Sequence, residues 1–454
     1  MFKRIILRYK ASIWFLPSVF ILGSIFLAIV IKVIDIFFID QFYKTFPVFL
    51  YTSIDFTRSI LSVIATSLLT MTAIIFSTIM IVFSMYSAQY SPKTLQNFIS
   101  DRLTQTVLGI FIAGFTYSIV SLLSIQEIKA NIVVFNPIFA IVLSLLCVGY
   151  FIRFIQYITV SIQINNLIEN IRKEILKTLK QKNREIEEIK DDGKVLLRLS
   201  NKKEKNKKET PVQIFPYIAG HIQIFDIKGL IKYSNEQDII VEANKRVGDY
   251  VTEKSLIFLI WNIKDNDEKD KIESSLKKYY SIGNYRNTDQ DIVFSLEKLE
   301  EIALRAISTG INDPNTAIHC IRNLADILLE ISKSYTGKLY FYDKEENLRF
   351  VLNDTSFEEI LYSTFYKILN SSRNMISILA SILESIIIIS EAKNDKIKKI
   401  LYDFTVYAIN GYDIKLLQDH DIQFLNLKIK KIAKNLNISQ LKILISREKI
   451  LKVD

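Results

Sequence analysis

Residues 60–83 have the sequence ILSVIATSLLTMTAIIFSTIMIVF, a run without Asp, Glu, Lys or Arg. A helix needs about 20 apolar residues to cross a bilayer core of ~30 Å. In hydrocarbon, each backbone N–H and C=O group has to find its partner within the segment, so we expect this run to be α-helical. The stretch therefore predicts a membrane-spanning helix.

Three further apolar runs lie on either side of this stretch, at residues 13–31, 107–124 and 132–152. With residues 60–83 they predict a transmembrane domain of four helices over residues 1–160. These bounds place Asp35 in the first loop and leave no charged residue deep inside a span. Because intramembrane charges mark many ion-coupled transporters, this pattern argues against that class.

Positive charge flanks the spans unevenly. Basic residues precede the first span and follow the fourth: Lys3, Arg4, Arg8, Lys10, Arg153, Arg172, Lys173 and Lys177. The positive-inside rule then predicts that both termini are cytosolic. We expect a multi-pass protein of a bacterial inner membrane, with the lipid bilayer as its partner. The net charge of +10 fits this orientation, and no nucleic-acid recognition module is visible.

The rest of the chain predicts a cytosolic α+β part. We expect an exit helix and charged linker at 161–211, a small β-rich module at 212–262 and a mainly helical domain at 263–454. The segments GHIQIFDIKGLI (220–231) and DIIVEANKRVGDYV (238–251) show short alternating runs that predict strands. Residues 338–342 and 348–352 predict a β-hairpin.

Helix signals dominate beyond residue 290. Helices are predicted over 291–307 and 314–334, with Gly310 left-handed at the end of the first. Asp313 is expected to cap the second helix and Pro314 to occupy its first position. The apolar segment 373–392 is too short for a fifth span and carries Glu384 centrally, which indicates a core or oligomer-interface helix.

The densest polar cluster surrounds the 291–307 helix. We single out as a candidate ligand or ion site Arg286, Asp289, Asp291, Arg305, Asn312 and Asp313. The carboxylates can hold a hard cation through oxygen, and the arginines can pair with them or bind an anion. The structural alternative is that these residues form helix caps and intrahelical ion pairs.

Small and hydroxylated residues recur along one face of the 60–83 helix and its C-terminal extension. The stripe consists of Ser62, Thr66, Thr70, Ser77 and Ser84. Such residues let membrane helices approach and hydrogen-bond. The alternative is a polar conduit lined by this stripe in an oligomer.

Enzyme and cofactor signatures are missing from the sequence. It contains no Walker A loop, dinucleotide-binding glycine pattern, nucleophile elbow, HExxH or CxxC pair. The two cysteines and three histidines are scattered, so neither a metal centre nor a cofactor is expected.

Three stretches resemble an uncharacterised bacterial family of predicted membrane proteins, domain of unknown function 2254. They are QYSPKTLQNFISDRLTQTVLGIFIAGFTYSIVSL (89–122), AGHIQIFDIKGL with NKRVGDYV (219–230 and 244–251), and NTDQDIVFSLEKLEEIALRAISTGINDPNTAIHCI (287–321). The family usually has Pro where this chain has Thr309, and an aromatic residue at Asn315. The resemblance implies a multi-span membrane protein with this domain order, but no established activity.

The leading hypothesis is a homo-oligomeric, channel- or transport-related protein whose cytosolic domain assembles or gates it. The alternative is a membrane-anchored sensor or scaffold that transports nothing. A membrane-tethered enzyme using the Asp289–Asp313 region is the third hypothesis.

Overall fold

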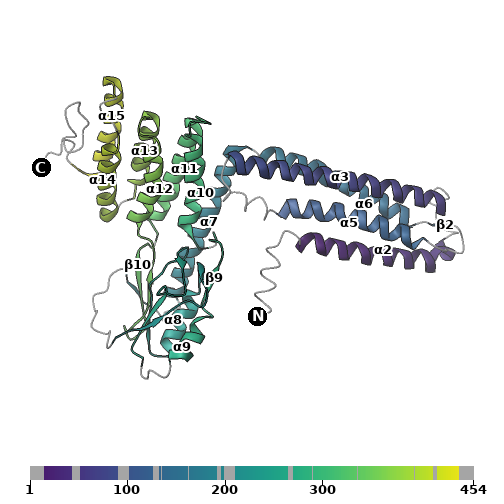
Figure 1. The fold of residues 1–454 in the computed structure, drawn as a ribbon, viewed down its shortest axis with the longest axis horizontal. Helices are drawn as coiled ribbons and strands as arrows, with labels where there is room; N and C mark the ends of the chain where they lie inside the picture. Colours follow the sequence, from purple (N-terminus) through teal and green to yellow (C-terminus); the bar gives the residue numbers. More distant parts are fainter. Residues whose placement is uncertain are drawn as a thin grey trace. The chain divides into compact units, whose positions relative to one another are not determined.

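The computed structural model describes most of the chain. It covers residues 15–42, 52–89, 102–125, 132–133, 135–161, 163–191, 196–198, 210–263, 269–288, 290–334, 336–392, 394–412 and 417–438. The chain forms two compact units, Met1–Asn166 and Leu167–Asp454, and each is described by itself. The ribbon is drawn in Figure 1.

The first unit consists of four long apolar helices, as the sequence predicts. They are α2 (Phe15–Phe42), α3 (Ile54–Gln89), α5 (Arg102–Ser124) and α6 (Phe135–Ser161). All four are long and apolar enough to cross a membrane. Helix α5 contacts the other three and is the most enclosed span, with 44 % of an apolar stretch of 18 residues buried. Strand β1 (Thr52–Ser53) pairs with β2 (Ile132–Val133).

The first span differs from the expected one, because α2 continues past residue 31 to Phe42. Asp35 therefore lies inside the apolar helix and not in a loop, and its side chain is only 2 % exposed. Its carboxylate accepts hydrogen bonds from Phe135 N (2.9 Å) and Asn136 N (3.1 Å) at the start of α6. The placement of Asp35 in the first loop was wrong, because α2 continues past residue 31 and the free amides at the N-terminus of α6 satisfy the carboxylate near the end of the span.

The second unit begins along α7 (Ile164–Asp191), a helix where the sequence predicts one; its exit from the membrane stays a prediction. One face of α7 is buried, including Ile168, Ile171 and Ile175. Arg172 in its early turns binds Asp326 of a later helix, and Lys182 further along binds Asp354. The helix thus contacts segments more than 150 positions away in the sequence.

Nine strands of this unit form two sheets. A six-stranded sheet has the order β3-β10-β11-β6-β8-β4, and a three-stranded sheet has the order β7-β5-β9. Only the β11–β6 pairing is parallel among the described strands. The strands are β3 (Leu196–Arg198), β4 (Val212–Ile214), β5 (Gly220–Phe225), β6 (Ile240–Ala243), β7 (Tyr250–Val251), β8 (Phe258–Trp261), β9 (Tyr280–Gly283), β10 (Lys338–Tyr342) and β11 (Leu348–Asn353).

The β10–β11 pair confirms the predicted hairpin. Residue 262 is the expected end of the β-rich module, but each sheet contains strands from before and after this residue. The segment after β5 differs from expectation, because α8 (Ile227–Glu236) is a helix and not a strand. Asp226 caps it by accepting from Gly229 N (2.9 Å). One face of α8 is buried and contains Leu230, Ile231 and Ser234. These residues recur at helical spacing, but the alternation of apolar and polar residues in this short segment indicated a strand.

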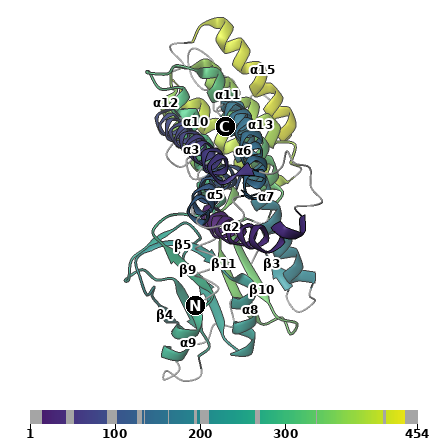
Figure 2. The same ribbon diagram turned by 90° about the vertical axis from the view of Figure 1, so that its right-hand side faces the viewer.

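Helices make up the remainder of the unit. They are α9 (Lys269–Leu276), α10 (Ile292–Ala306), α11 (Pro314–Ser332), α12 (Phe357–Ser371), α13 (Ile376–Ile389), α14 (Asp395–Asn410) and α15 (Asp419–Leu436). In Figure 2 the strands gather with α8 on one side of this unit, and α10–α15 lie together on the other. Apolar α13 contacts α11 and α15 and is largely buried, which confirms a core helix. Glu384 stays at its edge, paired with Lys428 and Arg322.

The turn between α10 and α11 follows the prediction except at one residue. Asp313 caps α11 and Pro314 stands in its first turn, as expected. The left-handed residue is Asn312 (φ 52°) and not Gly310. Asparagine tolerates this conformation, so the glycine signal pointed two residues too early.

Candidate functional site

The structure divides the predicted polar cluster between the two ends of α10. Arg286 and Asp291 lie at the start of the helix, whereas Arg305, Asn312 and Asp313 lie at its end. A rise of 1.5 Å per residue separates these ends by roughly 20 Å. One site cannot use both groups, and Asp289 lies outside the described residues.

Arg286 and Asp291 form a two-pronged ion pair. Arg286 Nε donates to Asp291 Oδ2 at 2.7 Å, and Nη2 donates to Oδ1 at 3.0 Å. The third nitrogen, Nη1, binds Glu297 at 2.9 Å. Burial lowers the pKa of Arg286, but its carboxylate partners outweigh that and raise the pKa above its ordinary value. The guanidinium is therefore a fixed positive charge.

Asp291 also caps α10, accepting from Phe294 N at 2.9 Å, and is 3 % exposed. The loop before β7 fits against this carboxylate through Gly248, which has φ +94°. A Cβ at position 248 would lie 2.2 Å from Asp291 Oδ2, so no larger residue fits there. In the same loop Arg246 binds Glu359 near the start of α12 (2.9 Å). The loop therefore connects the first turns of α10 and α12.

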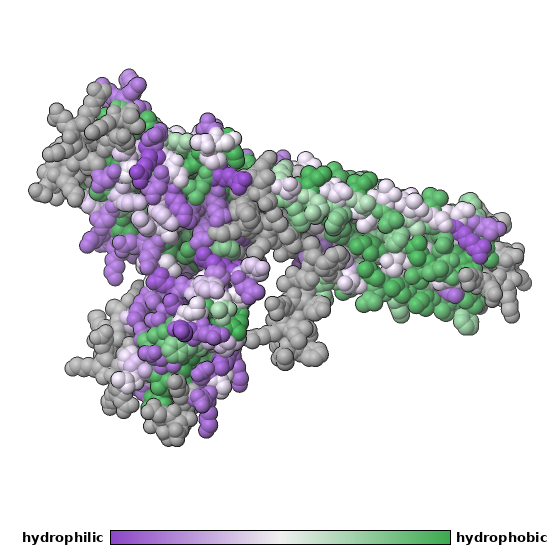
Figure 3. Space-filling view, in the orientation of Figure 1, coloured by the Kyte–Doolittle hydropathy of each residue, from purple (hydrophilic) through white to green (hydrophobic). Residues whose placement is uncertain are grey.

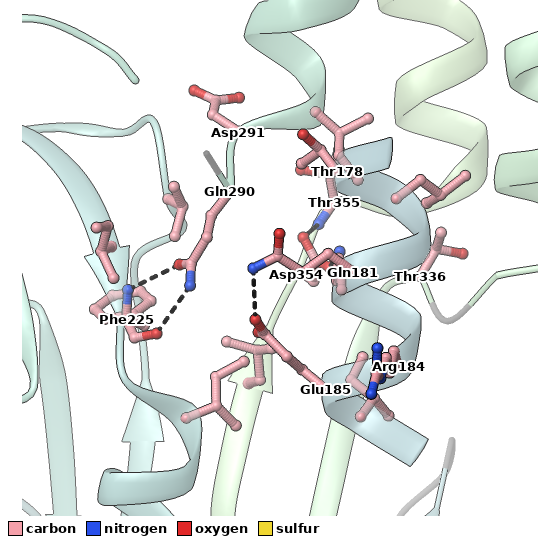
Figure 4. A pocket seen from close by; sticks show the side chains of 18 of the residues that line it. Thr178, Gln181, Arg184, Glu185, Phe225, Gln290, Asp291, Thr336, Asp354 and Thr355 are labelled. Atoms are coloured by element: carbon pink, nitrogen blue, oxygen red, sulfur yellow. Dashed lines mark hydrogen bonds and ion pairs between the residues drawn. The ribbon is translucent and has the colours of Figure 1, made fainter. Parts of the chain in front are cut away.

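A cavity of about 610 Å³ opens beside Asp291. Its walls come from α7, the β5–α8 junction, the first turn of α10, and the segment from β11 to α12. Figure 4 shows Thr178, Gln181 and Glu185 on α7 facing Phe225 and Gln290 across this space. The volume lies within the range of small-molecule sites, about 300–1,000 Å³.

Hydrogen bonds hold the cavity walls in place. Gln290 clamps the backbone of Phe225, accepting from its N at 3.0 Å and donating to its O at 3.3 Å. Lys182 joins α7 to Asp354 after β11. Lys228 of α8 binds Glu188 of α7 at 2.7 Å. These contacts tie all the walls together without filling the space between them.

The polar residues beyond the C-terminal end of α10 include a helix cap. Asp313 accepts from Thr316 N at 3.1 Å and from Thr316 Oγ1 at 2.6 Å. These hydrogen bonds lower the pKa of Asp313. The carboxylate is thus occupied as a helix cap, and binding by Arg305, Asn312 and Asp313 stays a prediction.

The predicted hydroxyl stripe lies on the exposed face of α3. Ser62, Thr66, Thr70, Ser77 and Ser84 are exposed, whereas Leu61, Ala65 and Leu68 face the other helices. Thr66 Oγ1 donates to Ser62 O and Thr70 Oγ1 to Thr66 O, each at 2.9 Å. The stripe therefore does not pack inside the four-helix unit of one chain.

Sequence reasoning missed most of the cavity. Asp291 was singled out and lines it, but Glu185, Lys182 and Gln181 were taken as parts of an exit helix. No local motif marks them, because segments that lie far apart in the sequence build the walls. In the described part of the chain, no group of three His, Cys, Asp or Glu side chains is placed to hold a metal.

Four helices long and apolar enough to span a membrane, followed by a second unit of helices and mixed sheets that encloses a cavity, define a class of multi-span membrane protein. The chain belongs to the family described as "Predicted membrane protein (DUF2254)", whose model matches residues 10–387.

Two mycobacterial proteins are similar to this chain. The chain is 26 % identical over 279 residues to an uncharacterised protein of Mycobacterium tuberculosis (strain CDC 1551 / Oshkosh) and to one of Mycobacterium bovis. The match covers 60 % of this chain and 51 % of each relative, so the chain spans about half the length of the curated relatives it matches. No solved structure matches the chain.

Proposed function

We propose that this protein is a membrane-anchored sensor whose soluble unit binds a small molecule. The observation that carries the proposal is the 610 Å³ cavity, with walls fixed by side-chain hydrogen bonds. Concave, largely pre-formed sites of this size with a few placed polar groups are typical of ligand-binding proteins.

The position of α7 in the chain supports a sensing function. This helix forms one wall of the cavity and begins at Ile164, three residues after α6 ends at Ser161. A ligand that favours one arrangement of α7 therefore biases the segment that enters the membrane.

The proposal is tested on full-length protein in lipid nanodiscs. Small molecules that co-purify with the protein are extracted and identified by mass spectrometry. Ile224→Trp fills the cavity from β5, where Ile224 is 37 % exposed; Ile311→Trp, at 46 % exposed and outside the cavity, is the matched control. We expect a compound retained by the wild type and Ile311→Trp but lost from Ile224→Trp.

The absence of any such compound, together with no thermal shift from a metabolite library, would contradict the proposal. The library is needed because a weakly bound ligand is lost during purification. A shift shared by the wild type and Ile224→Trp counts against the cavity as the site.

A second candidate is an oligomeric channel or transporter, and the exposed stripe on α3 favours it. In a homo-oligomer, neighbouring copies of α3 can turn these hydroxyls toward a shared path. Liposomes containing the protein should then show solute flux that falls when Thr66, Thr70 and Ser77 are replaced by Leu. The same flux from the triple variant would remove the conduit.

We also propose that both termini of the chain lie on the cytosolic side of the membrane. The basic residues before α2 and after α6 support cytosolic termini, and the mycobacterial relatives support a bacterial inner membrane. A reporter fused to either terminus should be active only in the cytosol.

A further inference from the structure

Most charges around the cavity are already neutralised by neighbours. Asp354 is paired with Lys182, and Asp291 with Arg286. Glu188 binds both Lys228 (2.7 Å) and Arg184 (3.1 Å). The ionised side chains that line the cavity are Lys182, Arg184, Lys228, Glu185, Glu188, Asp226, Asp291 and Asp354, so carboxylates exceed basic groups.

An anionic ligand finds no open position in these walls. The starts of α8 and α10 both border the cavity, and helix N-termini are ordinary anion sites. Asp226 and Asp291 occupy them, accepting from Gly229 N and Phe294 N. An incoming anion would have to displace these carboxylates and lie close to their charge.

Glu185 differs from the other carboxylates. It lies on α7 and extends into the cavity in Figure 4, where Gln181 Nε2 donates to its Oε1 at 3.0 Å. That partner is a neutral amide, and the described part of the chain supplies no cation to Glu185 within ion-pair distance. Its negative charge is therefore open to a ligand.

The wall beside Glu185 is apolar. Ile186 and Ile189 of α7 line the cavity together with Ile224, Phe225 and Ile227. A ligand that satisfies both surfaces carries a positive group next to a hydrocarbon or aromatic body.

We infer that the cavity takes an organic cation, a protonated amine on an apolar body, with the amine bound to Glu185. This inference rests on the proposed ligand-binding function and names the class of ligand. The ammonium group donates to the free lone pairs of Glu185, and the body packs on the isoleucines and Phe225.

Three probes with one common body test the inference: 4-phenylbutylamine, 4-phenylbutan-1-ol and 4-phenylbutyrate. Their Kd values are measured by calorimetry on full-length protein in nanodiscs, with empty nanodiscs and Ile224→Trp as references. We expect the amine to bind roughly tenfold more tightly than the alcohol, and the carboxylate to bind most weakly.

Two variants of α7 assign the preference to one side chain. Glu185→Gln should make the amine and the alcohol equal while leaving the Kd of the alcohol unchanged. Glu187→Gln, exposed two residues away and outside the cavity, should keep the amine preference.

The outcomes separate the two proposals. Equal binding of the amine and the alcohol by the wild type, or stronger binding of the carboxylate, overturns the inference and leaves the cavity as a binding site. An equal loss of preference in both variants also overturns it. If no probe binds above empty nanodiscs and Ile224→Trp, the inference of an organic cation is overturned, whereas the proposed ligand-binding function fails only if the co-purification and library tests are negative as well.

Discussion

The two units of this protein place opposite kinds of side chain on their surfaces. In the first unit, Val63, Phe76 and Ile81 of α3 are exposed, while Thr104, Ser118 and Ser121 of α5 are buried. In the second unit, most apolar residues of α13 are buried. Figure 3 shows the hydrophobic surface concentrated over the four apolar helices and hydrophilic surface over the second unit. Apolar composition alone therefore does not say where a helix belongs, because its neighbours decide which side is covered.

The largest expected effect on the free energy of unfolding comes from replacing a buried leucine of the second unit by alanine, and the same substitution at an exposed leucine of the first unit is its control. Leu383→Ala in α13, where Leu383 is fully buried, should lower the free energy of unfolding by about 2–5 kcal/mol. Leu69→Ala in α3, where Leu69 is 53 % exposed, should cost less than about 0.5 kcal/mol. Chemical unfolding of the protein in detergent measures both values. An equal loss of unfolding free energy in the two variants would contradict the difference in burial between the two units.

The second unit also contains buried charged side chains, and Glu300 is one of them. Glu300 on α10 is 1 % exposed, and its Oε2 receives Lys367 Nζ at 3.2 Å. Its Oε1 has no hydrogen-bond partner among the residues that the structure describes. Burial raises the pKa of Glu300 to about 7, above the ordinary carboxyl value.

This raised pKa predicts a pH dependence of stability. Between the unfolded pKa, about 4.3, and pH 7 the folded chain binds more protons than the unfolded chain. The free energy of unfolding should therefore fall as the pH rises across this window and level off above it. Glu300→Gln should remove the fall and be more stable than the wild type by about 2–3 kcal/mol at pH 8, with little difference at pH 5.

Thermal unfolding between pH 5 and pH 8 checks this prediction. Glu253→Gln, on an exposed turn, is the matched control and should reproduce the wild-type profile. Parallel curves for Glu300→Gln and the wild type would show that the buried carboxylate does not control the profile.

A smaller effect is expected from the polar interior of the first unit. Asp35→Ala removes the acceptor for two amides at the start of α6 and should cost about 1–2 kcal/mol. Ser24→Ala is the control, because Ser24 Oγ donates to Ile21 O in its own helix and links no other element. Thermal unfolding in detergent compares the two variants. Equal stability would mean that the α2–α6 connection adds little.

Sequence reasoning succeeded where the signal is local. The four apolar runs, the α7 helix, the Asp313–Pro314 start of α11 and the β10–β11 hairpin all follow from patterns within one segment. Asp35 was wrongly placed in a loop, because the backbone amide of Phe135 that donates a hydrogen bond to its carboxylate lies 100 residues away in the sequence. A single-segment pattern cannot contain that information.

The candidate site was less predictable than the fold. Arg286 and Asp291 are close in sequence and form an ion pair. Asn312 and Asp313 lie beyond the other end of α10, too far away to belong to the same site. The cavity depends on contacts such as Lys182 with Asp354, which join distant segments. Glu185 shows no unusual pattern along α7, so only the assembled walls single it out.

The parallel pairing of β11 with β6 has a consequence for biosynthesis. Phe350 pairs with Val241, so β11, one of the two middle strands of the six-stranded sheet, is synthesised more than 100 residues after its neighbour β6. A ribosome that has released only the first 340 residues holds a chain in which β6 lacks one neighbour. Such an open edge is a template for wrong partners. Messenger truncated before this point should therefore yield a product that enters the bilayer normally but is cleared by quality-control proteases.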